Sequence, residues 1–238
     1  MENEKGERSM EKENSLLTVE DFLENKSEIN IKGKNFENLM FVYKMAIKQI
    51  ENNIEIINEE FKFLYNYELI DHISTRIKSP ESIIKKMKKK KYDLTYKNLI
   101  ENINDIAGIR IVCNVKDEIV QIKELLASFP NIKIIKEKDY VTKPKKSGYS
   151  SYHLIVEVPV NIMGKNIPMR AEIQIRTKAM DFWATLEHKI KYKSNNKLPK
   201  KVSKELVSCA KMINKMDAQM TELYSKEMFM IENSVKKR

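Results

Sequence analysis

Charged and small polar side chains gather in the segment that begins at Arg76. Its sequence is Arg76-Ile77-Lys78-Ser79-Pro80, followed by a lysine-rich stretch that includes Ser82, Lys86 and Lys89. Ser followed by Pro is typical of a helix start, where free backbone N–H groups and nearby cations suit a phosphate chain. The alternative is that these lysines form only a solvated helix face.

Two carboxylates stand beside predicted strands. Asp105 comes directly before the apolar stretch 106–113, and Glu172 begins the sequence Glu172-Ile173-Gln174-Ile175-Arg176. Because side chains alternate along a strand, Glu172, Gln174 and Arg176 share one face. Carboxylates from two strands would supply the two oxygen ligands that Mg²⁺ typically takes from a protein in phosphoryl-transfer sites. The alternatives are a turn residue at Asp105 and a solvent face on the second strand.

A basic segment with aromatic residues lies between the two carboxylates. Its sequence is Lys143-Pro144-Lys145-Lys146-Ser147-Gly148-Tyr149-Ser150-Ser151-Tyr152-His153. Such a loop can hold a nucleotide, with its lysines on the phosphates and Tyr149 against the base. Aromatic residues among basic ones also stack on unpaired bases, so single-stranded RNA is a second candidate ligand.

The overall charge also favours an anionic ligand, but it does not show which one. Forty-four Lys and Arg against 34 Asp and Glu give a formal net charge of +10. This excess favours a polyanionic partner, although richness in Lys, Ile and Asn also follows from A/T-rich codons. No apolar run approaches the ~18–20 residues that cross a bilayer, and the N-terminus lacks a secretory signal. We therefore expect no membrane partner and a cytoplasmic location.

Hydrophobic periodicity supplies the elements that position these residues. Apolar side chains at steps of three and four predict a long helix over 36–66. Further helices are predicted from 79 into the lysine cluster and over 94–101, 117–128, 178–193 and 199 to about 231. Buried strands are predicted over 106–113, 132–136, 151–160 and 167–177, the last two forming a hairpin around Gly164. Residues 138–149 are predicted as a loop.

This order predicts an α/β (α+β) fold with a mixed sheet of about five strands, flanked by long N- and C-terminal helices. We divide the chain into a mobile polar arm (1–35), a central domain (36–198) and a C-terminal oligomerisation helix (199–238). The last helix carries more apolar side chains than one small sheet covers, among them Met212, Met216, Met220, Tyr224, Met228 and Met230. The alternative is that this helix folds back on its own domain.

Four segments resemble the synthetase domain of the RelA/SpoT family in its short, stand-alone form, the RelQ-type small alarmone synthetases. They are RIKSPESIIKKMKKK (76–90), DIAGIRIVC (105–113), DY…KSGYSSYHLIVEVP (139–159) and EIQIRTKAMDFWATLEHKIKYK (172–193). The resemblance covers about residues 36–230. It implies a nucleotidyltransferase-like sheet and a chain that synthesises without hydrolysing. The implied reaction is transfer of pyrophosphate from ATP to the ribose 3′-OH of GTP or GDP, with GMP left open as acceptor.

The resemblance also implies roles for individual residues. Arg76 and Arg110 would stack on the adenine of ATP, and the triphosphate would be held by Lys78, Ser82, Lys86 and Lys89. Asp105 and Glu172 would bind Mg²⁺, and Glu172 would also take the proton of the 3′-OH. Tyr149 would stack on guanine. The acceptor's other contacts would come from Lys138, Lys143, Lys145, His153, Gln174, Asp181 and Glu187.

Several residues depart from the family pattern. Asp181 stands where members often carry Asn, and Lys138 stands where a close type carries Arg. Members form homotetramers through terminal helices, and some bind the alarmone in a central cleft through a Lys and a Phe. We therefore expect a tetramer here. Because this chain has Glu55 and His72 at the positions of the Lys and the Phe, we expect little activation by the product. The competing hypothesis is a basic RNA-binding or regulatory protein that retains the fold, although such a protein has no use for two carboxylates in a cationic pocket.

Overall fold

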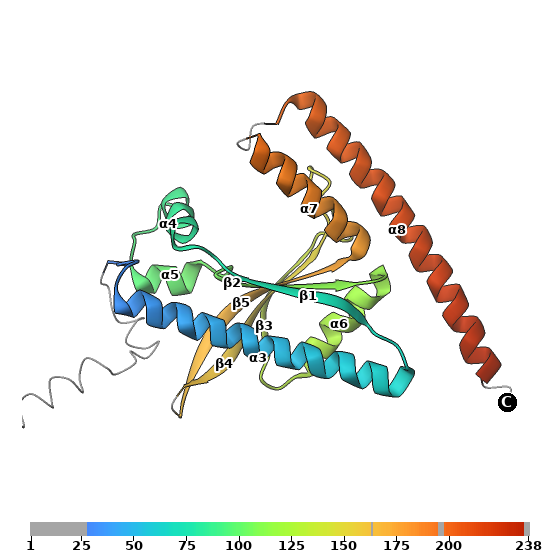
Figure 1. Cartoon of the computed structure of the whole chain (residues 1–238), viewed down its shortest axis with the longest axis horizontal. Helices are drawn as coiled ribbons and strands as arrows, with labels where there is room; N and C mark the ends of the chain where they lie inside the picture. Colours follow the sequence, from blue (N-terminus) through green and yellow to red (C-terminus); the bar gives the residue numbers. More distant parts are fainter. Residues whose placement is uncertain (1–27, 163, 195–197, 236–238) are drawn as a thin grey trace, which may run out of the picture.

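A mixed β-sheet lies at the centre of the molecule, with a long helix across it and two helices at one end (Figure 1). The computed structural model describes residues 28–162, 164–194 and 198–235. Within them the sheet has five strands in the order β1-β2-β5-β4-β3. β2 and β5 run parallel, and the other neighbouring pairs are antiparallel. The predicted fold class is thereby confirmed.

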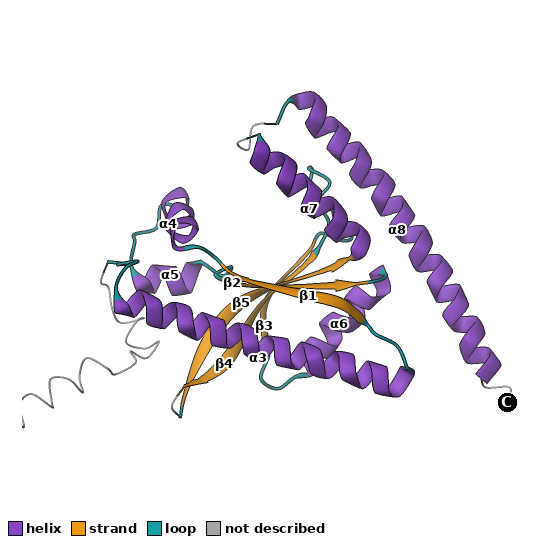
Figure 2. Cartoon of the chain, viewed as in Figure 1, coloured by secondary structure: helices purple, strands orange, loops and turns teal. Residues whose placement is uncertain are grey.

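The elements alternate between helix and strand along much of the chain (Figure 2). The helices are α3 (Lys34–Tyr65), α4 (Pro80–Lys89), α5 (Tyr96–Asn102), α6 (Lys116–Ser128), α7 (Lys178–Lys193) and α8 (Lys200–Val235). The strands are β1 (Ile70–Ile77), β2 (Ala107–Cys113), β3 (Lys133–Asp139), β4 (Tyr152–Ile162) and β5 (Lys165–Thr177).

β1 is the strand that the sequence analysis left unassigned. It lies at the sheet edge, pairs with β2, and exposes most of its residues. An edge strand of this kind lacks the continuous apolar run by which the buried strands were predicted. Two boundaries were also wrong. β3 continues to Asp139, inside the predicted loop, and the β4–β5 pairing reaches Ile162 and Lys165, so the connection at Gly164 (φ 82°) is shorter than predicted.

The two faces of the sheet differ sharply in polarity. One face presents apolar side chains, such as Ile109 and Ile173, which belong to a core shared with α3 and α6. The central strands place Gly108, Arg110, Glu172 and Gln174 on the other face, because their neighbours in sequence are the buried apolar residues. The alternation that gives the protein a core on one side therefore gives it a polar floor on the other.

The structure describes the N-terminal segment from Glu28 onward. Residues 1–27 of the predicted arm lie outside the described residues. Glu28 forms a β-bridge with Thr95, and the backbone N–H of Ile29 donates to the carbonyl of Leu94 at 2.8 Å. Residues 28–30 are thus held beside α5.

α8 packs on the body of the protein along one side. Trp183 Nε1 of α7 donates to the Leu206 carbonyl at 3.1 Å, and Thr177 Oγ1 donates to Asp217 Oδ2 at 2.9 Å. The opposite side of α8 is at least half exposed at Met212, Met216, Met220 and Leu223. The side chains of Met228 and Met230 lie outside the described residues. The helix therefore folds back on its own domain and still presents an apolar stripe. None of the helices in the described part is long and apolar enough to span a membrane.

The loop before β4 meets α8 at Gly148, which has a φ of 91°. A Cβ atom there would lie 2.4 Å from the Ala210 Cβ, whereas a Cβ at Gly164, which also has a positive φ, would meet nothing within 4 Å. We predict that Gly148→Ala lowers the free energy of unfolding by ~1–3 kcal/mol more than Gly164→Ala, since overpacking adds to the shared backbone strain. Denaturant unfolding of both variants measures this difference. Equal losses would show that the contact with α8 is not formed.

Candidate active site

The strand register lines up the polar residues of three strands. Arg76 of β1 pairs with Gly108 of β2, and Gly108 pairs with Glu172 of β5. One step along, Arg110 pairs with Gln174 of β5, which is paired in turn with His153 of β4. Because side chains of paired residues lie on the same face, the predicted residues Arg76, Arg110, Glu172, Gln174 and His153 are brought together.

Asp105 lies directly before β2 and is held by two lysines. Its Oδ2 is 2.7 Å from Lys86 Nζ and 3.2 Å from Lys78 Nζ. Its Oδ1 is buried and has no hydrogen-bond partner among the described residues. Burial raises the pKa of Asp105, but the two ammonium groups outweigh it, so the pKa lies below its usual value. The carboxylate is ionised at neutral pH, with one oxygen left free.

Glu172 is the second buried carboxylate on the polar face. His153 Nδ1 lies 3.2 Å from its Oε1, and Gln174 Nε2 donates to its Oε2 at 2.9 Å. Burial and the negative charge of Asp105 raise the pKa of Glu172, but His153 and Gln174 lower it further, and the net result is a depressed pKa. Asp105 and Glu172 are thus ionised neighbours in a partly dehydrated site.

The two carboxylates fit a magnesium ion. Mg²⁺ is usually held by one or two protein carboxylates together with substrate phosphates and water, and ionised oxygen ligands are the kind it prefers. Asp105 offers an oxygen that has no partner among the described residues, and Glu172 is kept charged beside it. The described residues contain no cluster of three or more His, Cys, Asp or Glu side chains of the type that would form an all-protein metal site.

A pocket opens next to Gly108. It has about 440 Å³ of empty volume and is lined by Ser74, Thr75, Arg76, Gly108, Ile109, Arg110 and Gln174. A Cβ on Gly108 would lie 3.4 Å from the Cγ and Nε of Arg76, so the Arg76 side chain lies directly over this position of β2. Arg110 Nε is buried without a partner in the described structure. Two guanidinium groups therefore flank a cavity that could take a planar base.

The other residues predicted to hold the triphosphate follow Arg76 closely in sequence, just before α4 and along it. Ser79 caps the helix, since its Oγ accepts from the Ser82 backbone N–H at 3.3 Å, and the two hydroxyls are 3.0 Å apart. Lys86 lies next to Asp105, with which it forms an ion pair. Lys89, three residues after Lys86, is exposed. Pro80 has no N–H, and the N–H groups of Ser82 and Ile83 are bonded to Ser79, so the helix start offers a phosphate chiefly side chains, the Ser82 hydroxyl beside Lys78 and Lys86.

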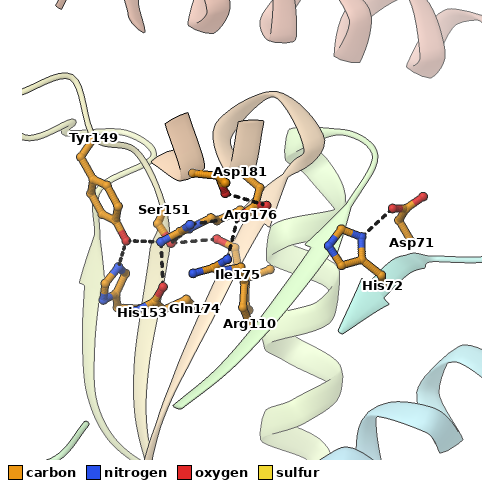
Figure 3. A network of polar contacts seen from close by, with 11 residues as sticks. Asp71, His72, Arg110, Tyr149, Ser151, His153, Gln174, Ile175, Arg176 and Asp181 are labelled. Atoms are coloured by element: carbon orange, nitrogen blue, oxygen red, sulfur yellow. Dashed lines mark hydrogen bonds and ion pairs between the residues drawn. The ribbon is translucent and has the colours of Figure 1, made fainter. Parts of the chain in front are cut away.

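Arg176 lies at the centre of a hydrogen-bond network on the opposite side of the site (Figure 3). Its Nη2 donates to the Tyr149 hydroxyl and to Gln174 Oε1, both at 2.7 Å. Its Nη1 is 3.0 Å from Asp181 Oδ1. The Tyr149 hydroxyl is also 2.7 Å from His153 Nε2. Sequence reasoning placed Arg176 on the polar face but gave it no role, because most of its partners lie outside β5, in the loop before β4 and on α7.

The remaining predicted residues surround Tyr149. Lys145 Nζ lies 4.6 Å from the centre of the Tyr149 ring and 4.4 Å from that of Tyr140, an aromatic residue that received no role from the sequence. Lys138 pairs with His153 across β3 and β4, and Lys143 is exposed in the loop. Glu187 of α7 forms an ion pair with Lys191.

Asp181 differs from its expected state. We expected its carboxylate to be available to a guanine base, but Oδ1 is shared between Arg176 at 3.0 Å and Arg110 Nη1 at 3.3 Å. Oδ2 accepts from Thr185 Oγ1 at 3.5 Å and is the less engaged oxygen. Asp181 thus links an arginine that lines the pocket to the arginine at the centre of the network.

A second cavity lies between α3 and β1. Its empty volume is about 410 Å³, and its lining consists of Glu55, Asn58, Glu59, Ile70, Asp71, His72 and Ile73. His72 Nδ1 is 2.8 Å from Asp71 Oδ2, and Asp71 Oδ1 is 2.5 Å from Lys178 Nζ. Acidic side chains predominate in this lining, which makes it a poor site for a phosphate group.

Comparisons with known proteins agree on one family. A model described as a region found in RelA/SpoT proteins matches residues 75–197. The GTP pyrophosphokinase YwaC of Bacillus subtilis is 41% identical over 187 residues, which are 79% of this chain and 89% of that protein. The structure of small alarmone synthetase 2 from B. subtilis is 40% identical, with a TM-score of 0.73, and the match covers 81% of this chain and all of that one. Small alarmone synthetase 1 of the same organism, bound to its product pppGpp, is 32% identical with a TM-score of 0.76 and covers 82% and 98%.

The pairing of Asp105 with two lysines can be tested by titration. We predict that Lys86→Met raises the pKa of Asp105, because burial then opposes ionisation with only Lys78 left to favour it. The Asp105 carboxylate stabilises the fold above its unfolded pKa, and this stability is lost as pH falls through the folded pKa. The loss should therefore begin at higher pH in the variant. NMR titration of the carboxyl carbon measures the pKa, with the exposed Lys88→Met as control. An unchanged pKa in Lys86→Met would contradict the ion pair.

Proposed function

Because this chain belongs to the RelA/SpoT family, we propose that it is a GTP pyrophosphokinase of the stringent response. It transfers the β,γ-pyrophosphate of ATP to the ribose 3′-OH of GTP or GDP, which yields pppGpp or ppGpp and AMP. The observation that carries this proposal is the pair of ionised carboxylates, Asp105 and Glu172, set among cations beside a base-sized pocket. The relationship to a GTP pyrophosphokinase over most of both chains supports it.

ATP is assigned to the pocket beside Gly108. Arg76 and Arg110 flank the pocket, and planar guanidinium groups stack well on an adenine ring. From there the triphosphate extends toward the start of α4, where its charges meet Lys78, Lys86, Lys89 and the Ser82 hydroxyl. Mg²⁺ held by Asp105, Glu172 and the phosphates would neutralise the negative charge that develops during transfer.

The chemical step is an in-line displacement in which Glu172 acts as the base. The acceptor's 3′-oxygen forms a bond to the β-phosphorus while the bond from that phosphorus to the oxygen shared with the α-phosphate breaks. The 3′-OH proton passes to Glu172, and AMP leaves with the bridging oxygen. Its depressed pKa keeps Glu172 ionised at neutral pH, which leaves it able to accept the proton but makes it a weak base. Most of the acceleration then comes from positioning and charge neutralisation.

The acceptor nucleotide is assigned to the side of the site formed by Tyr149. The Tyr149 ring supplies a stacking surface for guanine, and the loop lysines with Lys138 suit the 5′-phosphates. Gln174 and Glu187 are assigned to the ribose side. Asp181 can accept guanine N–H groups at Oδ2, its less engaged oxygen. Both ring nitrogens of His153 are already bonded, so His153 contacts a phosphate only by exchanging a partner.

Glu172→Gln tests the assignment of the base. We predict that it lowers kcat ~10²–10⁴-fold while nucleotide binding largely remains, because the amide keeps the shape of the carboxylate but cannot take the proton. Incubation with ATP, labelled GDP and Mg²⁺ measures the formation of AMP and 3′-pyrophosphorylated guanosine. Glu157→Gln is the matched control, since Glu157 pairs with Arg170 instead. Activity of Glu172→Gln within tenfold of the wild type would remove Glu172 from this role.

Assembly into a homotetramer is a further part of the proposal. The exposed apolar stripe of α8 contains Met212, Met216, Met220 and Leu223, and stripes of this kind usually bury against a partner. The oligomeric family members on which this expectation rests assemble through terminal helices. We therefore assign to α8 both its packing on the domain and an interface between copies.

In the tetramer we expect little stimulation by guanosine tetra- or pentaphosphate. The cavity between α3 and β1 is lined by Glu55, Glu59 and Asp71, and these carboxylates repel a polyphosphate at neutral pH. Light scattering measures the mass, and initial rates with and without added product measure the stimulation. A monomer would contradict the assembly. Several-fold stimulation in a tetramer would show that Glu55 and His72 do not prevent activation by the product.

A further inference from the structure

Arg176 is a buried cation that joins its own strand, β5, to two other segments of the chain, the loop before β4 and α7. Its side chain is 5% exposed. The guanidinium donates to Tyr149 and Ser151 in the loop before β4, to Gln174 of β5 and to Asp181 of α7, at 2.7, 3.3, 2.7 and 3.0 Å. A buried arginine needs paired charge and satisfied donors, and Asp181 supplies the charge. Its five N–H donors and fixed planar geometry suit this role, which a lysine fills only in part.

The contacts close into a ring that contains the proposed base. Arg176 donates to Gln174 Oε1, so the Gln174 amide turns its Nε2 toward Glu172 Oε2. The other oxygen of Glu172 faces His153 Nδ1. An ionised carboxylate only accepts, so Nδ1 carries the hydrogen, and His153 Nε2 then accepts from the Tyr149 hydroxyl. That hydroxyl accepts from Arg176, which completes the circuit.

The same guanidinium also supports the Tyr149 ring from behind. Its central carbon lies 5.1 Å from the centre of the ring, within the range of a cation–π contact. Tyr149 is only partly buried, Lys145 lies over its ring, and the ring also packs against the cluster of Trp183, Ala184 and Ala210. Without the bond to Arg176, the ring would keep its hydroxyl contact with His153 but lose its anchor to β5.

We propose that Arg176 is a positioning residue for the acceptor side of the site. It fixes the Tyr149 ring for stacking on guanine and orients the Gln174 amide toward Glu172, without itself touching the reacting atoms. This inference rests on the proposed function, because it uses the acceptor assignment of Tyr149. It separates Arg176 from the cations that bind phosphate, since Arg176 donates four hydrogen bonds to protein atoms and its side chain is only 5% exposed.

Substitution of Arg176 should affect the two nucleotides unequally. We expect Arg176→Met to raise the acceptor KM about tenfold or more and to lower kcat, while the ATP KM changes less than about threefold. Arg176→Lys should lie between the wild type and Arg176→Met, because an ammonium keeps the charge opposite Asp181 but loses the fork geometry. Calorimetric binding of GDP alone, without ATP, gives the same order independently of turnover.

Arg170→Met is the matched control. Arg170 lies on the same strand six residues earlier, on the same face, and makes its own ion pair with Glu157 and a hydrogen bond to the Glu101 carbonyl. Its loss should lower the melting temperature while leaving both KM values near those of the wild type. If Arg176→Met raises both KM values by the same factor, or if Arg170→Met also raises the acceptor KM selectively, Arg176 has no specific role in positioning.

Tyr149 variants keep the proposal testable if Arg176→Met does not fold. Tyr149→Phe keeps the ring and removes only the hydroxyl that Arg176 and His153 hold, whereas Tyr149→Ala removes the stacking surface as well. We expect Tyr149→Phe to raise the acceptor KM several-fold and Tyr149→Ala to raise it further, with the ATP KM nearly constant in both. An acceptor KM unchanged in Tyr149→Phe would show that the ring needs no tether, and the proposal would be wrong.

The wild-type protein separates failure of this inference from failure of the proposed function. If the wild type forms no AMP and no 3′-pyrophosphorylated guanosine, the GTP pyrophosphokinase assignment fails. If the wild type is active and the Arg176 and Tyr149 variants do not raise the acceptor KM more than the ATP KM, only the positioning role fails.

Discussion

The parallel pairing of β2 with β5 is the constraint on which the site depends. These two central strands put Gly108 beside Glu172 and Arg110 beside Gln174, and the antiparallel neighbours β1 and β4 add Arg76 and His153 to the same rows. Parallel strands are buried on both faces in most folds, so a polar row on one of them needs compensation. Here His153 of β4 pairs with Glu172, and Asp181 of α7 pairs with Arg110. A shift of one residue between β2 and β5 would move Glu172 away from Gly108 and Arg110 away from Gln174.

Ion pairs with carboxylates allow several cations to lie close together at the polar face of the sheet. Arg76, Arg110 and Arg176 share the polar face with two carboxylates, and Asp181 accepts from two of the arginines. Burial alone would raise the pKa of Asp105 and of Glu172, yet both pKa values are depressed, because lysines hold the first carboxylate and His153 with Gln174 hold the second. The positive excess that remains is directed at the pocket and the start of α4, which is where a triphosphate would bring its own negative charge.

Local patterns predicted the parts of the fold that are locally determined. The apolar stripes of α3 and α8, the helix start at Ser79-Pro80 and the β4–β5 hairpin all follow from residues close in sequence. β1 was missed because an exposed edge strand has no such pattern. The alternation Glu172-Gln174-Arg176 predicted a shared face, but the partners of Arg176 could not be predicted, since they depend on how the loop, β4 and α7 converge. For the same reason the sequence left Asp181 free for a ligand, when two arginines hold it.

α8 contacts the site at several points while it exposes its methionine stripe on the other side. Ala210 lies against Gly148 of the loop that carries Tyr149, and Leu206 accepts from Trp183 of α7. Asp217 accepts from Thr177, which follows Arg176 directly and caps α7. Deletion of α8 would therefore remove supports of the acceptor side together with any interface between copies, and a loss of activity would report on both. Only a change confined to the exposed stripe, such as one at Met216, separates assembly from the geometry of the site.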